Sequence, residues 1–177
     1  MVHFPRRRAA PPPARRVPVV GGDRPPAPAR VRGESFEPGR VFALFGGRGT
    51  GKSTLARVVH EETETATALI SWTGDPEAVE AEVTATRKRG VEVIVLDGCP
   101  TSVDDVQWLY DERLVAPAFG GAVVQVVRNA AVDPSFGARL NALEARILDL
   151  SMPYFVVRND DLERAVVDLL CRAGVVR

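Results

Sequence analysis

Cysteine and long apolar runs are scarce in this sequence, and each scarcity argues against a class of protein. The 177 residues include two cysteines, Cys99 and Cys171, which are too few and too far apart for a disulfide framework or a cysteine-based metal site. No apolar run approaches the roughly 20 residues of a membrane-spanning helix, and the N-terminus lacks the apolar segment of a secretory signal. We therefore expect a cytoplasmic, intracellular protein in a reducing compartment, without a transmembrane segment.

The first 39 residues differ in composition from the rest of the chain. Residues 1–38 contain nine of the fourteen prolines, which disfavours helices and central strands. Residues 1–40 hold nine arginines against three acidic residues, a net charge of about +6. We expect residues 1–39 to form a disordered basic Pro/Arg-rich tail. Its arginine clusters suit nucleic acid or another anionic surface, but a solubilising tail has the same composition.

Strand-like and helix-like segments alternate from residue 40 onward, which predicts one α/β domain over residues 40–177. The expected strands lie near 41–45, 68–72, 92–97, 122–127 and 154–158, and the expected helices near 52–62, 76–89, 102–113, 136–150 and 160–172. Such alternation predicts a three-layer fold, in which helices cover both faces of a five-stranded parallel sheet.

Local patterns support several of these helices. Three helix starts are indicated by Asp75 before Pro76, by Ser102 with Asp105, and by Asp160 with Glu163. One apolar helical face is formed by Leu140, Leu143, Ile147 and Leu150, and we interpret it as core packing.

Residues 46–53 read Gly-Gly-Arg-Gly-Thr-Gly-Lys-Ser, which fits the pattern of Gly, four residues, then Gly-Lys-Ser. The pattern lies between an apolar strand-like run and a helix-like segment, which is the context of a phosphate-binding loop. Glycines let backbone N–H groups converge on phosphate oxygens, Lys52 reaches the β and γ phosphates, and the Ser53 hydroxyl suits Mg²⁺. A Gly-rich turn without a ligand is the alternative. We expect a P-loop NTPase fold whose nucleotide contacts are Gly46, Gly47, Arg48, Gly49, Thr50, Gly51, Lys52, Ser53 and Thr54.

An aspartate ends the third expected strand. Asp97 follows the apolar run 91–96, at the position of the carboxylate that supports the Mg²⁺ shell in P-loop enzymes. The alternative role of this carboxylate is an N-terminal cap for the next helix. Gly98 follows, where many ATP-hydrolysing motors have a glutamate, and the sequence contains no Asn-Lys-x-Asp segment for guanine recognition. These residues favour a kinase that uses Mg²⁺ and ATP.

Three further segments carry a family resemblance. Residues 70–75 (Ile-Ser-Trp-Thr-Gly-Asp) and 96–101 (Leu-Asp-Gly-Cys-Pro-Thr) follow the phosphate loop in the order found in adenylate kinase and its nucleoside monophosphate kinase relatives, which this chain resembles. Residues 153–165 are similar to the last strand and helix of guanylate kinases. The resemblance spans roughly residues 41–173. It implies a sheet with the phosphate-loop strand at the centre and the Asp97 strand beside it.

The resemblance also implies an activity and its residues. The expected reaction is transfer of the γ-phosphoryl group from ATP to a nucleoside monophosphate, in which the protein supplies positioning and charge. Lys52 would hold the donor phosphates, while Ser53 and Asp97 would hold the metal. Thr73 and Asp75 would lie at the acceptor. Trp72 either stacks on a base or packs at the end of its strand.

The chain departs from the family at acceptor-binding positions. Pro76 and the next two residues stand where the family has an arginine after Thr-Gly-Asp, and Thr101 replaces a second arginine. The stretch between Asp75 and Asp97 is too short for the family's acceptor-binding region, and residues 128–139 are too few for a large lid. The cations that could replace the missing arginines are Arg48, Arg87, Lys88, Arg89, Arg128, Arg139 and Arg146. Arg128 and Arg139 are the expected catalytic pair, because they follow the fourth strand.

Two other interpretations remain open at this point. An NTP-binding or NTP-hydrolysing module, tethered to nucleic acid or a larger assembly by its basic tail, accounts for the missing acceptor arginines. A structural protein with a vestigial loop is disfavoured, since Lys52, Ser53 and Asp97 are all present.

Overall fold

The computed structural model describes residues 39–63, 67–115, 120–129 and 133–175. The predicted tail over residues 1–39 therefore lies almost wholly outside the described residues, as does its proposed contact with nucleic acid. The elements are β1 (Arg40–Phe45), α1 (Lys52–Glu62), β2 (Thr67–Ser71), α2 (Pro76–Lys88), β3 (Val93–Asp97), α3 (Val103–Asp111), β4 (Ala122–Val127), α4 (Pro134–Asp149), β5 (Tyr154–Arg158) and α5 (Leu162–Arg172). This alternation of strands and helices confirms the predicted α/β class.

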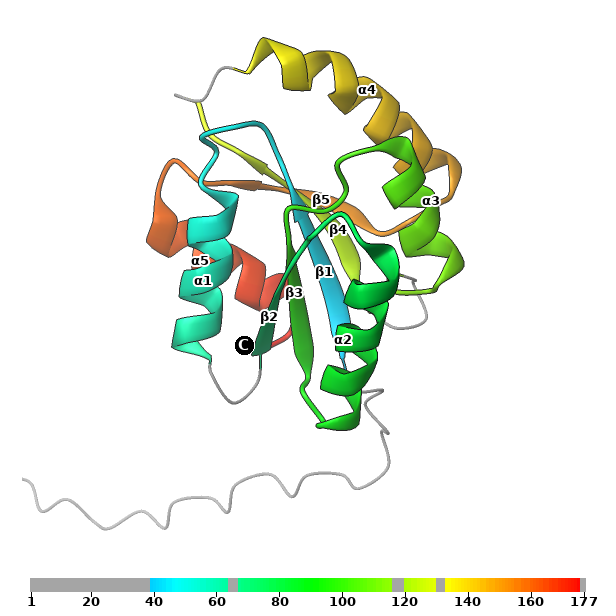
Figure 1. Ribbon diagram of the computed structural model, residues 1–177. Coiled ribbons are helices and arrows are strands. Elements are labelled where there is room, and N and C mark those ends of the chain that lie inside the picture. The colour runs from blue at the N-terminus through cyan, green and yellow to red at the C-terminus, as the bar shows by residue number, and fades with distance from the viewer. Residues whose placement is uncertain (1–38, 64–66, 116–119, 130–132, 176–177) are drawn as a thin grey trace, which may run out of the picture. The chain divides into compact units, whose positions relative to one another are not determined.

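The five strands form one parallel sheet in the order β2-β3-β1-β4-β5 (Figure 1). β1 is central because it pairs with β3 on one side, where Leu44 lies opposite Asp97, and with β4 on the other. The strand that leads into the phosphate loop is thus central and the Asp97 strand is beside it, as predicted. All the carboxyl ends point to one edge of the sheet, where ligands bind in open parallel sheets.

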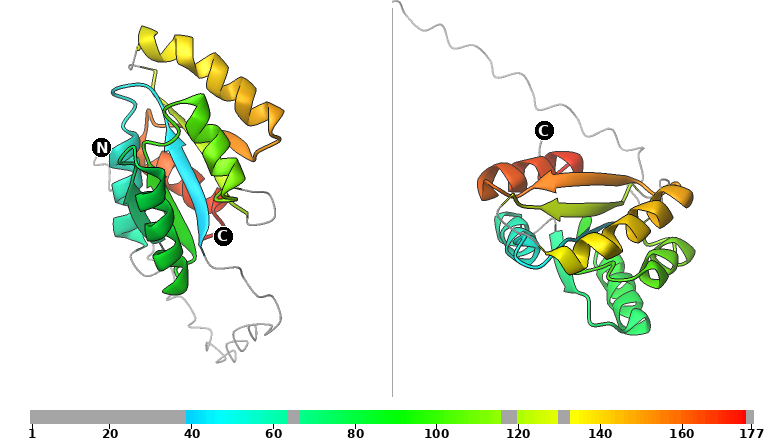
Figure 2. Two further views of the ribbon diagram at one scale, coloured as in Figure 1. Left: turned by 45° about the vertical axis from the view of Figure 1, so that its right-hand side comes forward. Right: turned by 90° about the horizontal axis from the view of Figure 1, so that it is seen from above.

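Helices cover both faces of the sheet, which gives three layers (Figure 2). Side chains alternate along β1, so that Val41, Ala43 and Phe45 pack with α2, α3 and α4, whereas Phe42 and Leu44 pack with α1 and α5. Because both faces are covered, β1 is an almost continuous apolar run with every residue from 41 to 45 buried. Leu143 and Ile147 of α4 are buried, and Leu140 and Leu150 are partly buried against the same core, which confirms that face as core packing.

Two predicted helix starts are confirmed and one is wrong. Asp75 accepts hydrogen bonds from the backbone amides of Glu77 and Ala78, and Ser102 forms a reciprocal capping box with Asp105. At α5 the cap is Asp161, whose side chain accepts from the Arg164 amide. The prediction placed this cap at Asp160. The Asp160 carboxylate instead accepts a hydrogen bond from the backbone amide of Asn129, 2.8 Å away, and so links the end of β4 to the end of β5.

The two tryptophans pack on each other at the end of β2. The rings of Trp72 and Trp108 have centroids 5.1 Å apart, and both rings pack against the core on the α2 and α3 face. The structure therefore uses Trp72 for packing at the strand end. Among the described helices, none combines the length and apolar character needed to cross a membrane.

The two cysteines differ in reactivity. Cys99 is buried in the core, and burial, with a smaller effect of the Asp105 charge, raises its pKa, whereas Cys171 is exposed on α5. Because the thiolate is the reactive form, we expect a disulfide reagent such as DTNB to modify Cys171 alone in the native protein. Both thiols should react in guanidinium. Native Cys171→Ser protein should not react, and rapid modification of Cys99 in that variant would contradict the buried placement.

Candidate phosphate-binding site

The phosphate loop joins β1 to α1 at the carboxyl edge of the sheet (Figure 1). Gly49 and Gly51 have φ values of 81° and 78°, in the left-handed region that side chains disfavour. Helix α1 begins at Lys52 and has no side-chain cap. Its first backbone N–H groups are therefore left for a ligand, and the helix dipole favours an anion there.

Neighbouring segments leave no room for side chains at two loop glycines. A Cβ atom on Gly46 would lie well inside van der Waals contact with the Val126 carbonyl oxygen of β4. A Cβ atom on Gly51 would lie 2.5 Å from Nδ2 of Asn159. Glycine is thus required at these positions by packing as well as by the ligand.

Two side chains, one in the loop and one after β5, brace the loop. The Thr50 hydroxyl donates to the Gly47 carbonyl, 3.0 Å away, and the Asn159 amide nitrogen donates to the Thr50 carbonyl, 2.9 Å away. Thr50 and Asn159 are 5% and 7% exposed, so both bonds are shielded from water. Asn159 follows β5, and its backbone amide donates to the Val127 carbonyl of β4. Sequence reasoning assigned Asn159 no role, because its partner is 109 residues away.

A carboxylate from the start of α4 also contacts the loop. The Arg48 backbone amide donates to Oδ2 of Asp133, 3.0 Å away, while Oδ1 accepts the Ser135 hydroxyl at 2.6 Å and the Phe136 amide at 3.1 Å. These hydrogen bonds, that of Ser135 foremost, lower the pKa of Asp133 to about 2. Asp133 is therefore ionised at neutral pH, and sequence reasoning missed it.

A cavity of about 380 Å³ opens between the phosphate loop, the segment after β3 and the start of α4. Its lining residues are Phe45, Gly46, Arg48, Lys52, Gly98, Pro100, Thr101, Asp133, Ser135, Phe136 and Arg139. The cavity thus joins three predicted cations, Arg48, Lys52 and Arg139, to one carboxylate. Its charge suits an anionic ligand.

Asp97 stands beside this cavity with an unsatisfied oxygen. Its Oδ1 atom is buried and has no hydrogen-bond partner among the described residues. Its backbone is fixed on both sides, since Trp72 donates to the Asp97 carbonyl and Gly98 donates to the Leu44 carbonyl, each at 2.9 Å. A buried carboxylate oxygen without a donor is costly, and a metal ion or metal-bound water would satisfy it.

Several predicted residues do not line this cavity. Thr73 and Asp75 are exposed at the end of β2, where Asp75 caps α2, and Arg128 is exposed at the end of β4. Thr101, which stands where the resembled family has an arginine, lines the cavity but donates its hydroxyl to Asp105 at 2.7 Å. Ser53 and Thr54 are exposed in the first turn of α1.

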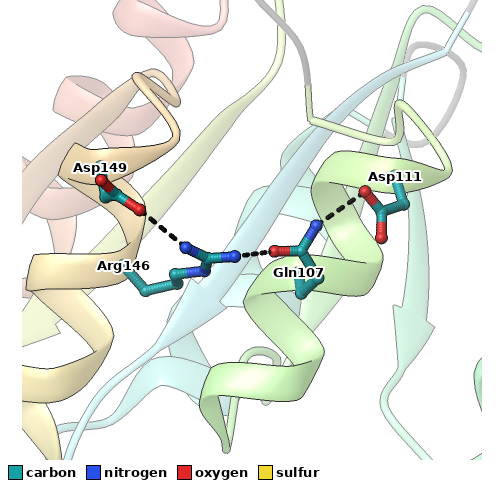
Figure 3. A network of polar contacts seen from close by, with 4 residues as sticks. All are labelled: Gln107, Asp111, Arg146 and Asp149. Atoms are coloured by element: carbon teal, nitrogen blue, oxygen red, sulfur yellow. Dashed lines mark hydrogen bonds and ion pairs between the residues drawn. The ribbon is translucent and has the colours of Figure 1, made fainter.

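Two of the candidate cations, Arg146 and Arg87, bind residues that are distant in the sequence. Arg146 of α4 is bound to Gln107 of α3 and to Asp149, 2.7 Å away, and Gln107 in turn donates to Asp111 (Figure 3). This network pins α3 to α4. Arg87 donates to the Gly39 carbonyl at 3.1 Å, before the first strand. Both arginines therefore serve the fold.

No protein-family model and no curated protein matches this chain. Among solved structures, the chain is similar to a de novo designed protein of a P-loop fold, with a TM-score of 0.52 and 14% identity over 78% of this chain and 97% of that one. It is also similar to a sugar kinase from a Janibacter species (TM-score 0.49, 15% identity, 78% and 96% covered) and to thymidylate kinase from Ehrlichia chaffeensis (TM-score 0.45, 11% identity, 76% and 98% covered).

Similarity at this level of identity concerns the fold. Together with the loop geometry, it shows that the described chain has the α/β P-loop NTPase fold, with a five-stranded parallel sheet.

Proposed function

We propose that this protein is an ATP-dependent P-loop kinase that transfers a phosphoryl group to a (deoxy)nucleoside monophosphate. The observation that carries the proposal is the cavity in which Lys52 of the braced phosphate loop meets Arg48 and Arg139. Phosphoryl transfer needs positioning and positive charge around the transferred group, and this cavity offers both.

Each residue has a role in this scheme. The backbone amides of residues 46–54 and the Lys52 ammonium group would bind the donor phosphates, while Arg139 and Arg128 would neutralise charge on the transferred group. Thr73 and Asp75 would contact the acceptor. Ser53 and Asp97 would hold Mg²⁺, which would neutralise phosphate charge when bound. The unpartnered Asp97 oxygen supports this metal site.

A second candidate is an NTP-hydrolysing module without an acceptor, tethered through its tail to nucleic acid or a larger assembly. It is favoured by one observation, since Thr101 is committed to Asp105 at a position where the resembled family places an acceptor-binding arginine. In this scheme the cavity would admit water in place of an acceptor.

ADP formation from Mg²⁺-ATP distinguishes the two candidates. The assay is run without acceptor and then with each ribo- and deoxynucleoside monophosphate. Turnover that requires one monophosphate, with the diphosphate product detected, supports the kinase and identifies its substrate. Phosphate release at the same rate with every acceptor supports the hydrolysing module. Absence of nucleotide binding would refute both.

Replacing Asp97 with asparagine tests the metal site. The change keeps the shape of the side chain but removes its charge, so we expect the apparent Mg²⁺ affinity of the ATP complex to fall about 10- to 100-fold. ATP affinity in EDTA should change little. Titration calorimetry with and without Mg²⁺ measures both, and Asp104→Asn, an exposed aspartate of α3, is the control. An equal loss of affinity in EDTA would show that Asp97 does not act through the metal.

A further inference from the structure

The contact between Asp133 and the phosphate loop is more than a helix cap. Three helices in the described chain are capped by aspartate, namely α2 by Asp75, α4 by Asp133 and α5 by Asp161. The side chains of Asp75 and Asp161 cap with Oδ1, and among the described residues they bond only within their own helix start. Asp133 also caps with Oδ1, but its Oδ2 bonds to the Arg48 amide, 85 residues earlier in the chain. That second bond contributes nothing to the cap.

The start of α4 is packed directly on the loop at this point. A Cβ atom on Gly47 would lie 3.3 Å from the Asp133 Cβ and 3.4 Å from the Phe136 ring. The Phe136 ring also packs on Phe45, with centroids 6.2 Å apart. Oδ2 of Asp133 is therefore held at the Arg48 amide by two neighbouring contacts and by the cap itself.

The Asp133 carboxylate lies where a phosphate group of a bound nucleotide would lie. Asp133, Arg48 and Lys52 line the same cavity, and Lys52 in this motif reaches the β and γ phosphates. Arg48 lies four residues before the start of α1, within the loop whose backbone amides bind the phosphates. A terminal phosphate near the Arg48 amide would meet the ionised Asp133 side chain, and like charges at such a distance repel.

We propose that Asp133 is a specificity-determining residue that competes with the terminal phosphate of the nucleotide for the Arg48 amide. In the nucleotide-free protein the Asp133 carboxylate accepts the hydrogen bond of that amide. When a nucleoside triphosphate binds, its γ-phosphate displaces the carboxylate and accepts the bond instead. The inference rests on the proposed function only in requiring that the loop binds nucleotide phosphates.

Asp133→Asn tests the proposal, because asparagine caps helices as well as aspartate does and removes the charge. Binding of AMP-PNP and of ADP, each with Mg²⁺, is measured by calorimetry for the wild type and the variant. We expect the Kd of AMP-PNP to fall about 10-fold in the variant and that of ADP to change less than about 3-fold. Asp161→Asn, the matched cap of α5, should change neither Kd, and its melting temperature shows the effect of an altered cap alone.

The outcomes separate the proposal from the function on which it rests. Unchanged AMP-PNP affinity in Asp133→Asn, or weaker binding of both nucleotides, would overturn the competition. In the wild type, a larger shift of the Arg48 amide signal in NMR spectra with AMP-PNP than with ADP would support it. If AMP-PNP and ADP bind neither protein, the assignment of the loop as a phosphate site fails, and the competition fails with it.

Discussion

Replacing Lys52 with alanine is expected to lower the rate of ADP formation by about 10²- to 10³-fold, the largest effect on activity of any substitution considered. The ammonium group is the cation that the motif carries to the β and γ phosphates, and it lines the cavity beside the loop. Removing one donor that is aimed at developing charge typically has an effect of this size. The rate is measured at saturating Mg²⁺-ATP with the acceptor identified by the screen.

The chain offers a matched control for this substitution, because it contains only one other lysine. Lys88 lies exposed at the end of α2, and although it was a candidate cation it does not line the cavity. Lys88→Ala removes the same side chain and charge, so any loss in that variant measures non-specific charge effects. A Lys52→Ala protein that is folded and as active as Lys88→Ala would refute the catalytic role of the loop.

Gly46→Ala is expected to combine a loss of stability with a loss of nucleotide binding. The added methyl group would meet the Val126 carbonyl, which cannot yield because β4 is paired with β1 and β5. Overpacking of this kind destabilises by about 1–3 kcal/mol, and relief of the clash would move the loop away from its phosphate-binding shape. We expect a lower urea midpoint and at least a 10-fold weaker AMP-PNP affinity.

A second glycine provides a control, because its replacement by alanine is expected to raise stability instead of lowering it. Gly137 lies within α4, where an added Cβ atom would have no neighbour within 4 Å in the described structure. Gly137→Ala should therefore stabilise the protein by about 0.5–1 kcal/mol, because alanine loses less backbone entropy in a helix. Similar destabilisation by both substitutions would show that the Gly46 effect does not come from the clash with β4.

Features that depend on neighbouring residues could be predicted from the sequence. The ten elements, the loop between β1 and α1, and the caps Asp75 and Ser102 follow from periodicity and from patterns within four residues. The central place of β1 came from the resemblance to adenylate kinases, since local patterns do not fix strand order. At α5 the local pattern placed the cap at Asp160 when it is Asp161, because Asp160 has a partner at the end of β4.

Features that depend on distant contacts could not be predicted. Asn159 and Asp133 reach the loop across 109 and 85 residues, and a polar residue after a strand or before a helix has many possible partners. The arginines show the same limit. Position after the fourth strand favoured Arg128 and Arg139 together, whereas in the structure Arg139 lines the cavity and Arg128 does not.

The central place of β1 has a consequence for how the chain folds. β1 lies at residues 40–45, but its two neighbours are residues 93–97 and 122–127, so it has no partner nearby in the chain. Pairings over such separations must close large loops before they gain any contact, which slows folding. Until β3 and β4 have paired with it, the apolar strand β1 has two unpaired edges, and these can pair with strands of other chains. Refolding yield should therefore fall as protein concentration rises, even though the folded sheet buries residues 41–45 of β1.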